Sequence, residues 1–280
     1  CNYDILIFTE GTPNFNASKV LNHLIKEEKI TIINKLFSLR KYVSRSGNET
    51  YEEKFPHASI CNLDTSLGYR DMCKFFSFDV FNDENLEKTD YFIRVDTDSF
   101  FLDVRPNFIN DLNNLDCDYG YISGTDQEED KAVSVGFGKC IYDYCQKSSK
   151  EFLPDNYFDI CNDATFKPKL FYTNFEVVNL NWIKSKESQK LLNHIINSEG
   201  IYRRRWGDAL IRYYSVKLLK ANKKELTGCF YKHFCIYDSR NKLRQFITKV
   251  FFKLFNKFYN NSFEKGFKFY ESKFLGIKNN

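Results

Sequence analysis

Two carboxylates, Asp96 and Asp98, follow the apolar segment 91–95 and have a single residue between them. The aromatic and β-branched residues of that segment predict a strand. In α/β sheets, ligands bind beyond the carboxyl ends of strands, which is where this pair would lie. Two hard oxygen donors there can hold a divalent cation against the diphosphate of a nucleotide. The spacing therefore predicts a metal and nucleotide site.

Asp-x-Asp triplets also arise by chance, so the surroundings of the pair decide its meaning. A second triplet, Asp116-Cys117-Asp118, lies in a loop-like segment that no strand precedes. Taken alone, Asp96 and Asp98 could instead cap a helix or a turn. The second triplet has no surroundings that distinguish it from a chance occurrence, so the other motifs of the chain must decide the role of the first.

Two further carboxylates stand at positions that suit catalysis. Glu176 lies in the apolar, strand-like segment 175–180, where an unpaired carboxylate is costly to bury. That cost favours a functional role over a structural ion pair. Asp208 precedes a predicted helix at 209–219, so it can cap this helix, act in catalysis, or do both.

His233 lies between Cys229 and Cys235, which raises the possibility of a zinc site. Three ligands without a fourth fit structural zinc poorly, and imidazole also suits manganese, so we favour manganese. The basic run Arg203-Arg204-Arg205 is compatible with a solvated surface and equally with binding to a diphosphate or an anionic acceptor.

The elements that position these residues alternate between strands and helices. Strand-like segments are expected at 4–8, 30–33, 91–95, 119–124 and 175–180. Helices are expected from residue 16 or 18 to 25 and at 69–78, 106–113, 184–198 and 209–219, with 125–168 irregular. This order predicts an α/β fold, with one continuous domain around a mixed central sheet.

Charge is distributed unevenly along the chain. The net charge of +4 combines about +8 in residues 240–280 with about −4 in residues 1–239, which argues against a nucleic-acid-binding fold. Segment 241–259 is amphipathic, with lysines on one side. It is expected either to pack on the body or to lie on an anionic membrane surface. Nine cysteines, an odd number, leave the redox compartment open.

Five motifs occur along the chain in the order Gly68–Ser77, Tyr91–Asp98, Thr173–Glu176, Arg205–Ala209 and Tyr231–His233. They resemble motifs of the fungal α-1,2-mannosyltransferase family, the glycolipid 2-α-mannosyltransferases, which are Golgi enzymes with a GT-A fold. Arg-Trp-Gly-Asp-Ala is unchanged from the family pattern, whereas Asp-Thr-Asp stands in place of Glu-Pro-Asp. The order and approximate spacing agree from residue 60 to residue 240.

The resemblance implies a donor side built from five residues. Asp96 and Asp98 correspond to the carboxylates that handle Mn²⁺ and the donor diphosphate, and His233 corresponds to a further manganese ligand. Tyr69 corresponds to a residue lining the donor pocket, with Arg70 beside it.

The resemblance also assigns the transfer step. Glu176 corresponds to the carboxylate proposed to face the anomeric carbon, as nucleophile or as ion-pair stabiliser. Asp208 corresponds to the candidate that accepts the proton of the acceptor hydroxyl. These roles agree with the chemical needs of the reaction: charge neutralisation, support of an oxocarbenium-like centre and a base.

The implied protein is a GT-A-type nucleotide-sugar transferase, with a mixed central sheet flanked by helices. Residues 1–239 would form the catalytic domain, its first strand lost by N-terminal truncation, and 240–280 a basic amphipathic tail. The expected reaction is Mn²⁺-dependent transfer of mannose from GDP-mannose to a mannose hydroxyl of a glycan, forming an α-1,2 link. The expected location is the Golgi or ER lumen, with a type II membrane anchor in the missing N-terminus. The alternatives are a GT-A transferase that uses another nucleotide sugar and a non-catalytic glycan-binding relative.

Overall fold

The computed structural model describes residues 4–9, 29–34, 67–96, 99–102, 104–122, 127–148 and 166–233. The chain divides into two compact units, one of Phe37–His233 and one of Cys1–Leu36 with Phe234–Asn280. In the second unit, strands β1 (Asp4–Thr9) and β2 (Lys29–Asn34) pair in parallel. Both strands confirm predictions made from short apolar runs.

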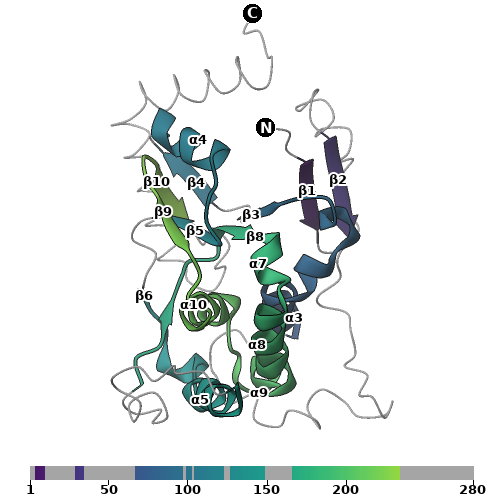
Figure 1. The fold of residues 1–280 in the computed structure, drawn as a ribbon, viewed down its shortest axis with the longest axis vertical. Coiled ribbons are helices and arrows are strands. Elements are labelled where there is room, and N and C mark those ends of the chain that lie inside the picture. Colours follow the sequence, from purple (N-terminus) through teal and green to yellow (C-terminus); the bar gives the residue numbers. More distant parts are fainter. Residues whose placement is uncertain are drawn as a thin grey trace, which may run out of the picture. The chain divides into compact units, whose positions relative to one another are not determined.

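The larger unit is built on a four-stranded mixed sheet (Figure 1). Its strands, in spatial order, are β3 (Tyr91–Val95), β8 (Phe175–Asn179), β5 (Tyr119–Ile122) and β9 (Lys223–Leu226). β8 is antiparallel to both of its neighbours, whereas β5 and β9 are parallel. The prediction of an α/β fold with a mixed sheet is confirmed.

Helices and two small ribbons complete the described part of this unit. The helices are α3 (Leu67–Ser77), α4 (Pro106–Asn113), α5 (Phe137–Ser148), α7 (Leu180–Ile183), α8 (Lys186–Asn197), α9 (Gly200–Arg204) and α10 (Asp208–Leu218). The ribbons are β4 (Ser99–Leu102) with β10 (Phe230–His233), and β6 (Gln127–Glu128) with β7 (Lys169–Leu170). α10 packs against α3, α8 and β7. Within the described ranges, no helix has the length and apolar character to cross a bilayer.

Four predicted helices, at 69–78, 106–113, 184–198 and 209–219, are confirmed within one or two residues. The prediction that 125–168 is irregular was wrong, because α5 lies inside it. Phe137, Cys140, Ile141, Tyr144 and Cys145 form its buried side, and their spacing is that of an amphipathic helix. The helix expected near residues 16–25 and the amphipathic tail lie outside the described residues.

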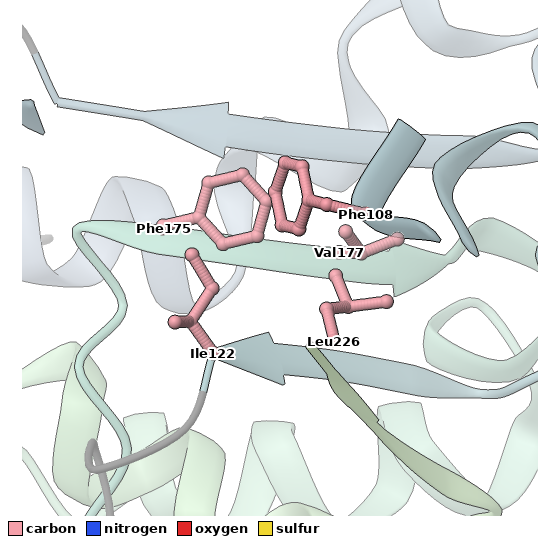
Figure 2. Packing of buried hydrophobic residues seen from close by; sticks show 5 residues of the cluster. All are labelled: Phe108, Ile122, Phe175, Val177 and Leu226. Atoms are coloured by element: carbon pink, nitrogen blue, oxygen red, sulfur yellow. The ribbon is translucent and has the colours of Figure 1, made fainter. Parts of the chain in front are cut away.

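The central strands β3 and β8 send alternate side chains to opposite faces of the sheet, as strand geometry requires. On one face Phe175 and Val177 join an apolar cluster with Phe108, Ile122 and Leu226 (Figure 2). The intervening residue of β8, Glu176, points to the other face, where α10 lies against it. The fold therefore separates a hydrophobic core from a charged layer by a single step along the strand.

Candidate functional site

The charged layer follows from strand register and helix period. Arg94 on β3 stands directly opposite Glu176 on β8, and paired residues of this kind share one face of the sheet. α10 contributes Asp208 and Arg212, which are four residues apart and so lie on the same side of the helix. Four charged side chains of alternating sign therefore meet between the strand pair and the helix.

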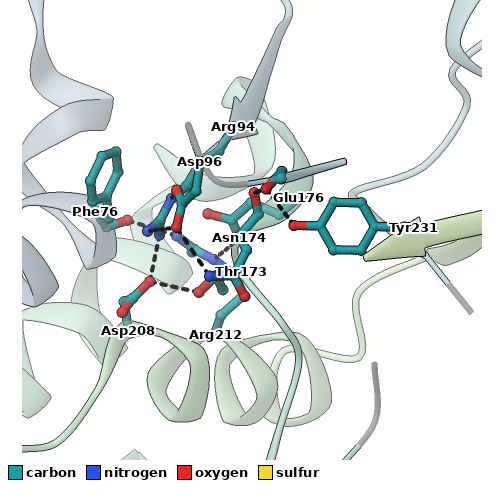
Figure 3. Close-up of polar contacts among 10 residues, drawn as sticks. Phe76, Arg94, Asp96, Thr173, Asn174, Glu176, Asp208, Arg212 and Tyr231 are labelled. Atoms are coloured by element: carbon teal, nitrogen blue, oxygen red, sulfur yellow. Dashed lines mark hydrogen bonds and ion pairs between the residues drawn. The ribbon is translucent and has the colours of Figure 1, made fainter. Parts of the chain in front are cut away.

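Arg94 bridges two carboxylates (Figure 3). Its Nε and Nη2 donate to Asp96 Oδ1 and Oδ2 at 2.8 and 3.3 Å, and its Nη1 donates to Asp208 Oδ2 at 2.5 Å. The guanidinium lies 3.8 Å from the centre of the Phe76 ring. Burial alone would lower the pKa of Arg94, but Asp208 and Asp96 raise it overall. Arg94 is therefore held as a cation in one orientation.

Thr173 and Asn174, in the turn before β8, hold the same two carboxylates from another side. Thr173 Oγ1 donates to Asp208 Oδ2 at 2.6 Å, and Asn174 Nδ2 donates to Asp96 Oδ2 at 3.0 Å. The backbone reinforces this arrangement, because the Asp96 amide donates to the Asn174 carbonyl at 2.9 Å. Each carboxylate is thus fixed by a guanidinium and by a neutral donor.

Glu176 forms a second and deeper ion pair. Its Oε2 accepts from Arg212 Nε at 2.9 Å, and the two side chains are 0% and 1% exposed. Arg212 also donates from Nη2 to the Phe76 carbonyl at 3.1 Å and lies over the Phe81 ring. Burial raises the pKa of Glu176, and Arg212 and Arg94 offset this only in part. The carboxylate that sequence reasoning favoured as functional is therefore also half of a buried ion pair.

The pKa values of Asp208, on α10, and of Glu176, which faces α10, are shifted in opposite directions. Burial would raise the pKa of Asp208, but the Arg94 charge and the hydrogen bonds from Thr173 and Arg94 lower it overall. The pKa of Glu176, in contrast, is raised. Divergent pKa shifts in neighbouring carboxylates are typical of sites that divide two chemical roles.

Asp96 is the most accessible of these three carboxylates, with 25% of its side chain exposed. Asp98 lies outside the described residues, and of His233 only the backbone is described. The Ser99 amide donates to the Asp96 carbonyl at 3.0 Å, and Ser99 pairs with His233 across the β4–β10 ribbon. Through its backbone, Ser99 therefore contacts both Asp96 and His233.

The three metal ligands expected from the sequence, Asp96, Asp98 and His233, have the chemistry that a divalent cation requires. A carboxylate has about four lone-pair positions, so Asp96 can accept the bonds from Arg94 and Asn174 and still bind a metal. Two carboxylates and an imidazole suit Mn²⁺. Within the described ranges no three candidate ligand side chains converge, and the side chains of Asp98 and His233 are not in those ranges.

The two α3 residues predicted to bind the donor occupy different environments. Tyr69 is half-buried, and the Arg205 guanidinium lies 4.4 Å from the centre of its ring. Arg205 adopts the left-handed conformation with φ of 64°, an uncommon conformation that is often found at functional sites. Arg70 is fully buried and donates from Nη1 to the Tyr202 carbonyl at 2.6 Å. Arg70 thus ties α3 to α9.

Several alternatives from the sequence are resolved by these contacts. Gly207 caps α10, and the Asp208 carboxylate turns to Arg94 and Thr173, so the capping hypothesis for Asp208 was wrong. In the second triplet, Asp118 Oδ2 accepts from the Asn222 amide at 2.8 Å, a contact between two loops.

Sequence reasoning missed the two bridging arginines. Arg212 lies in the apolar helix Asp208–Leu218, four residues after Asp208, and Arg94 lies in an apolar strand two residues before Asp96. A cation in an otherwise apolar element needs a buried partner, so both positions carried a signal. The partners themselves depend on the β3–β8 register, which the sequence did not specify.

A family model described as glycolipid 2-alpha-mannosyltransferase matches residues 2–240. The chain belongs to this family. The probable mannosyltransferase KTR3 of Saccharomyces cerevisiae is 28% identical over 158 residues, covering 55% of this chain and 39% of that protein. The O-glycoside alpha-1,2-mannosyltransferase homolog 3 of Schizosaccharomyces pombe is 28% identical over 169 residues, covering 58% and 44%. The matches span about two fifths of these relatives' length.

Solved structures of the family share the fold. The mannosyltransferase Ktr4p from S. cerevisiae in complex with GDP superposes with a TM-score of 0.65 at 19% identity, covering 83% of this chain and 63% of that one. Core-mannan synthase A from Aspergillus fumigatus, in an Mn/GDP form, gives a TM-score of 0.65 at 15% identity, covering 83% and 66%. The GT-A-type fold prediction is confirmed.

Proposed function

We propose that this member of the family transfers mannose from GDP-mannose to a mannose hydroxyl of a glycan, forming an α-1,2 link with the help of Mn²⁺. The observation that carries the proposal is the convergence of Asp96, Glu176 and Asp208, from three separate elements, around Arg94. The similarity to proteins named as mannosyltransferases, and to structures described with GDP and with Mn and GDP, supports the same reaction.

The donor end of the site is assigned to its exposed side. Asp96, Asp98 and His233 would hold Mn²⁺, which supplies positive charge to the leaving diphosphate. Asp96 suits this role because it is the more exposed of the two carboxylates that Arg94 binds. Tyr69 would line the donor pocket, where Arg205 covers one face of its ring.

Transfer breaks the bond between the mannose anomeric carbon and the diphosphate, and the bonding electrons leave with GDP. Glu176, held by Arg212 in a low-dielectric layer, provides negative charge for the oxocarbenium-like centre. The acceptor oxygen then bonds to the anomeric carbon and its proton passes to Asp208, whose lowered pKa keeps it in the ionised form that a base requires.

The similarity to the family also supports different roles for two parts of the chain. Residues 1–239 would form the catalytic domain, and the basic segment 240–280 would contact the body or a membrane surface. We place the protein in the Golgi or ER lumen, acting on glycans or glycoproteins and not on nucleic acid.

The test is a transfer assay with labelled GDP-mannose, Mn²⁺ and free mannose or mannobiose. The expected product is longer by one mannose and is cleaved by an α-1,2-specific mannosidase, and chelation of the metal abolishes its formation. UDP-galactose and UDP-N-acetylglucosamine serve as competing donors. Transfer from either of these in preference to GDP-mannose, or binding of glycan without turnover of any donor, would contradict the proposal.

A further inference from the structure

The Arg94 guanidinium uses all three of its nitrogens on carboxylates that belong to different substrates in the proposed reaction. Nε and Nη2 bind Asp96, to which the proposed function assigns the metal and donor, and Nη1 binds Asp208, to which it assigns the acceptor. The Arg94 Cζ lies over the Phe76 ring, 3.8 Å from its centre, so packing restrains the guanidinium as well. One rigid group therefore sets the separation between the two carboxylates.

Thr173 and Asn174 strengthen this coupling because they are consecutive residues of one turn. Each donates to one of the two carboxylates that Arg94 binds. A displacement of either carboxylate would thus disturb both the guanidinium and the turn. We propose that Arg94 is a positioning residue that couples the donor-side carboxylate Asp96 to the acceptor-side carboxylate Asp208 and holds Asp96 in its metal-binding orientation.

This inference rests on the proposed function, and it differs from a merely structural role in a way that can be measured. Lysine keeps the positive charge but is a single point donor, so it cannot reproduce a fork that serves two carboxylates. Loss of a partner that orients a metal ligand typically lowers metal affinity or activity by 10- to 100-fold, roughly. Arg212 provides the matched control, because it is equally buried but its one carboxylate partner is Glu176.

The experiment compares the full chain with its Arg94→Lys, Arg212→Lys and Arg203→Lys variants. Mn²⁺ affinity is measured by electron paramagnetic resonance without donor, and kcat, KM and the ratio of GDP-mannose hydrolysis to transfer are measured with it. Arg94→Lys is expected to weaken Mn²⁺ binding about tenfold and to raise the hydrolysed share. Arg212→Lys, and Arg203→Lys in its exposed pair with Glu199, are expected to leave Mn²⁺ binding within about twofold of wild type.

A double-mutant cycle with Asp208→Asn tests the coupling itself. Without the Asp208 charge, Arg94 pairs with Asp96 alone. Asp208→Asn should therefore weaken Mn²⁺ binding about threefold when Arg94 is present and by less when it is combined with Arg94→Lys. The Asp208→Asn effect in an otherwise wild-type chain keeps the inference testable if Arg94→Lys does not fold.

Wild-type Mn²⁺ affinity and kcat in Arg94→Lys would overturn the inference. An equal loss of Mn²⁺ affinity in Arg212→Lys, or an Asp208→Asn single variant that binds Mn²⁺ as wild type does, would overturn it too. A wild-type chain that binds Mn²⁺ but transfers no mannose would refute the proposed function and leave the positioning of Asp96 to be decided by the Mn²⁺ affinities. A wild-type chain that binds no Mn²⁺ would refute both.

Discussion

The two faces of the β3–β8 strand pair are made from neighbouring residues and have opposite character. Phe175 and Val177 lie on one face, in a hydrophobic cluster with Phe108, Ile122 and Leu226. Glu176 lies between them in sequence and points to the other face, into a layer of two arginines and three carboxylates. Because side chains alternate along a β-strand, β8 contributes both to the hydrophobic core and to the charged layer.

The two faces also differ in their energetic balance. Burial of apolar side chains stabilises the fold by roughly 25 cal/mol for each Å² removed from water. Buried ion pairs recover little net free energy, because their Coulomb attraction is offset by the loss of hydration. The apolar face should therefore tolerate changes that preserve volume, whereas the charged face should respond strongly to the loss of either partner.

The largest expected effect is that of Arg212→Met on the charged face. This change leaves Glu176 buried without its cation, so the free energy of unfolding should fall by about 3–5 kcal/mol. Urea denaturation measures the change, with Arg203→Met as a control whose exposed pair should cost less than about 1 kcal/mol. A loss below about 1 kcal/mol in Arg212→Met would mean that the deep pair is not as buried as the structure places it.

On the apolar face, Val177→Ala should lower the free energy of unfolding by about 2 kcal/mol, because it opens a cavity beneath Phe108 and Phe175. The affinity for Mn²⁺ should remain that of wild type, since the side chain points away from Asp96. Thermal unfolding and Mn²⁺ titration of the same sample check both parts. A change in metal affinity would show that the two faces are not independent.

Asp208→Asn tests whether the contribution of the charged face to stability depends on pH. The pKa of Asp208 is lowered in the folded state, so its contribution to stability is present above its ordinary pKa of 3.8 and is lost as the pH falls below that value. The free energy of unfolding of the variant should be about 1.5 kcal/mol lower at neutral pH. It should also fall less than that of wild type as the pH is lowered. Urea unfolding at pH 7 and at several acidic pH values measures this, and parallel curves for both proteins would contradict it.

The smallest effect is expected from Lys139→Ala, which removes an exposed ion pair with Asp143 on α5. Pairs of this kind contribute about 0.5 kcal/mol or less. Thermal unfolding of this variant sets the baseline for the other changes. A loss as large as that of Val177→Ala would mean that exposed charges stabilise this chain unusually well.

The sequence predicted those elements whose signal is local. The strand before Asp96 and the helix after Gly207 follow from apolar period and length, and both are confirmed. The five motifs indicated the family before any contact was visible. α5 was missed because Gly138 and its charged side chains obscured a helical spacing that was present.

The partners of the site residues could not be predicted, because they depend on register and packing across distant segments. Arg94 reaches Asp208 across 114 positions, and Arg212 reaches Glu176 across 36. The sequence placed Glu176 in an apolar strand and favoured function over an ion pair. The structure shows the pair with Arg212, and such a pair is compatible with the catalytic role proposed for Glu176.

The most direct test of the central claim, that the charged face transfers mannose, is the single-turnover rate of Glu176→Gln with GDP-mannose, Mn²⁺ and mannobiose. The amide keeps the size of the side chain and removes its charge. Because the change also removes the partner of the buried Arg212, the variant should be less stable than wild type, so the rate is measured under conditions where circular dichroism shows it folded. We predict a rate reduced by roughly 10²–10⁴-fold, with Mn²⁺ bound as in wild type. A folded Glu176→Gln protein that transfers mannose at the wild-type rate would contradict the account.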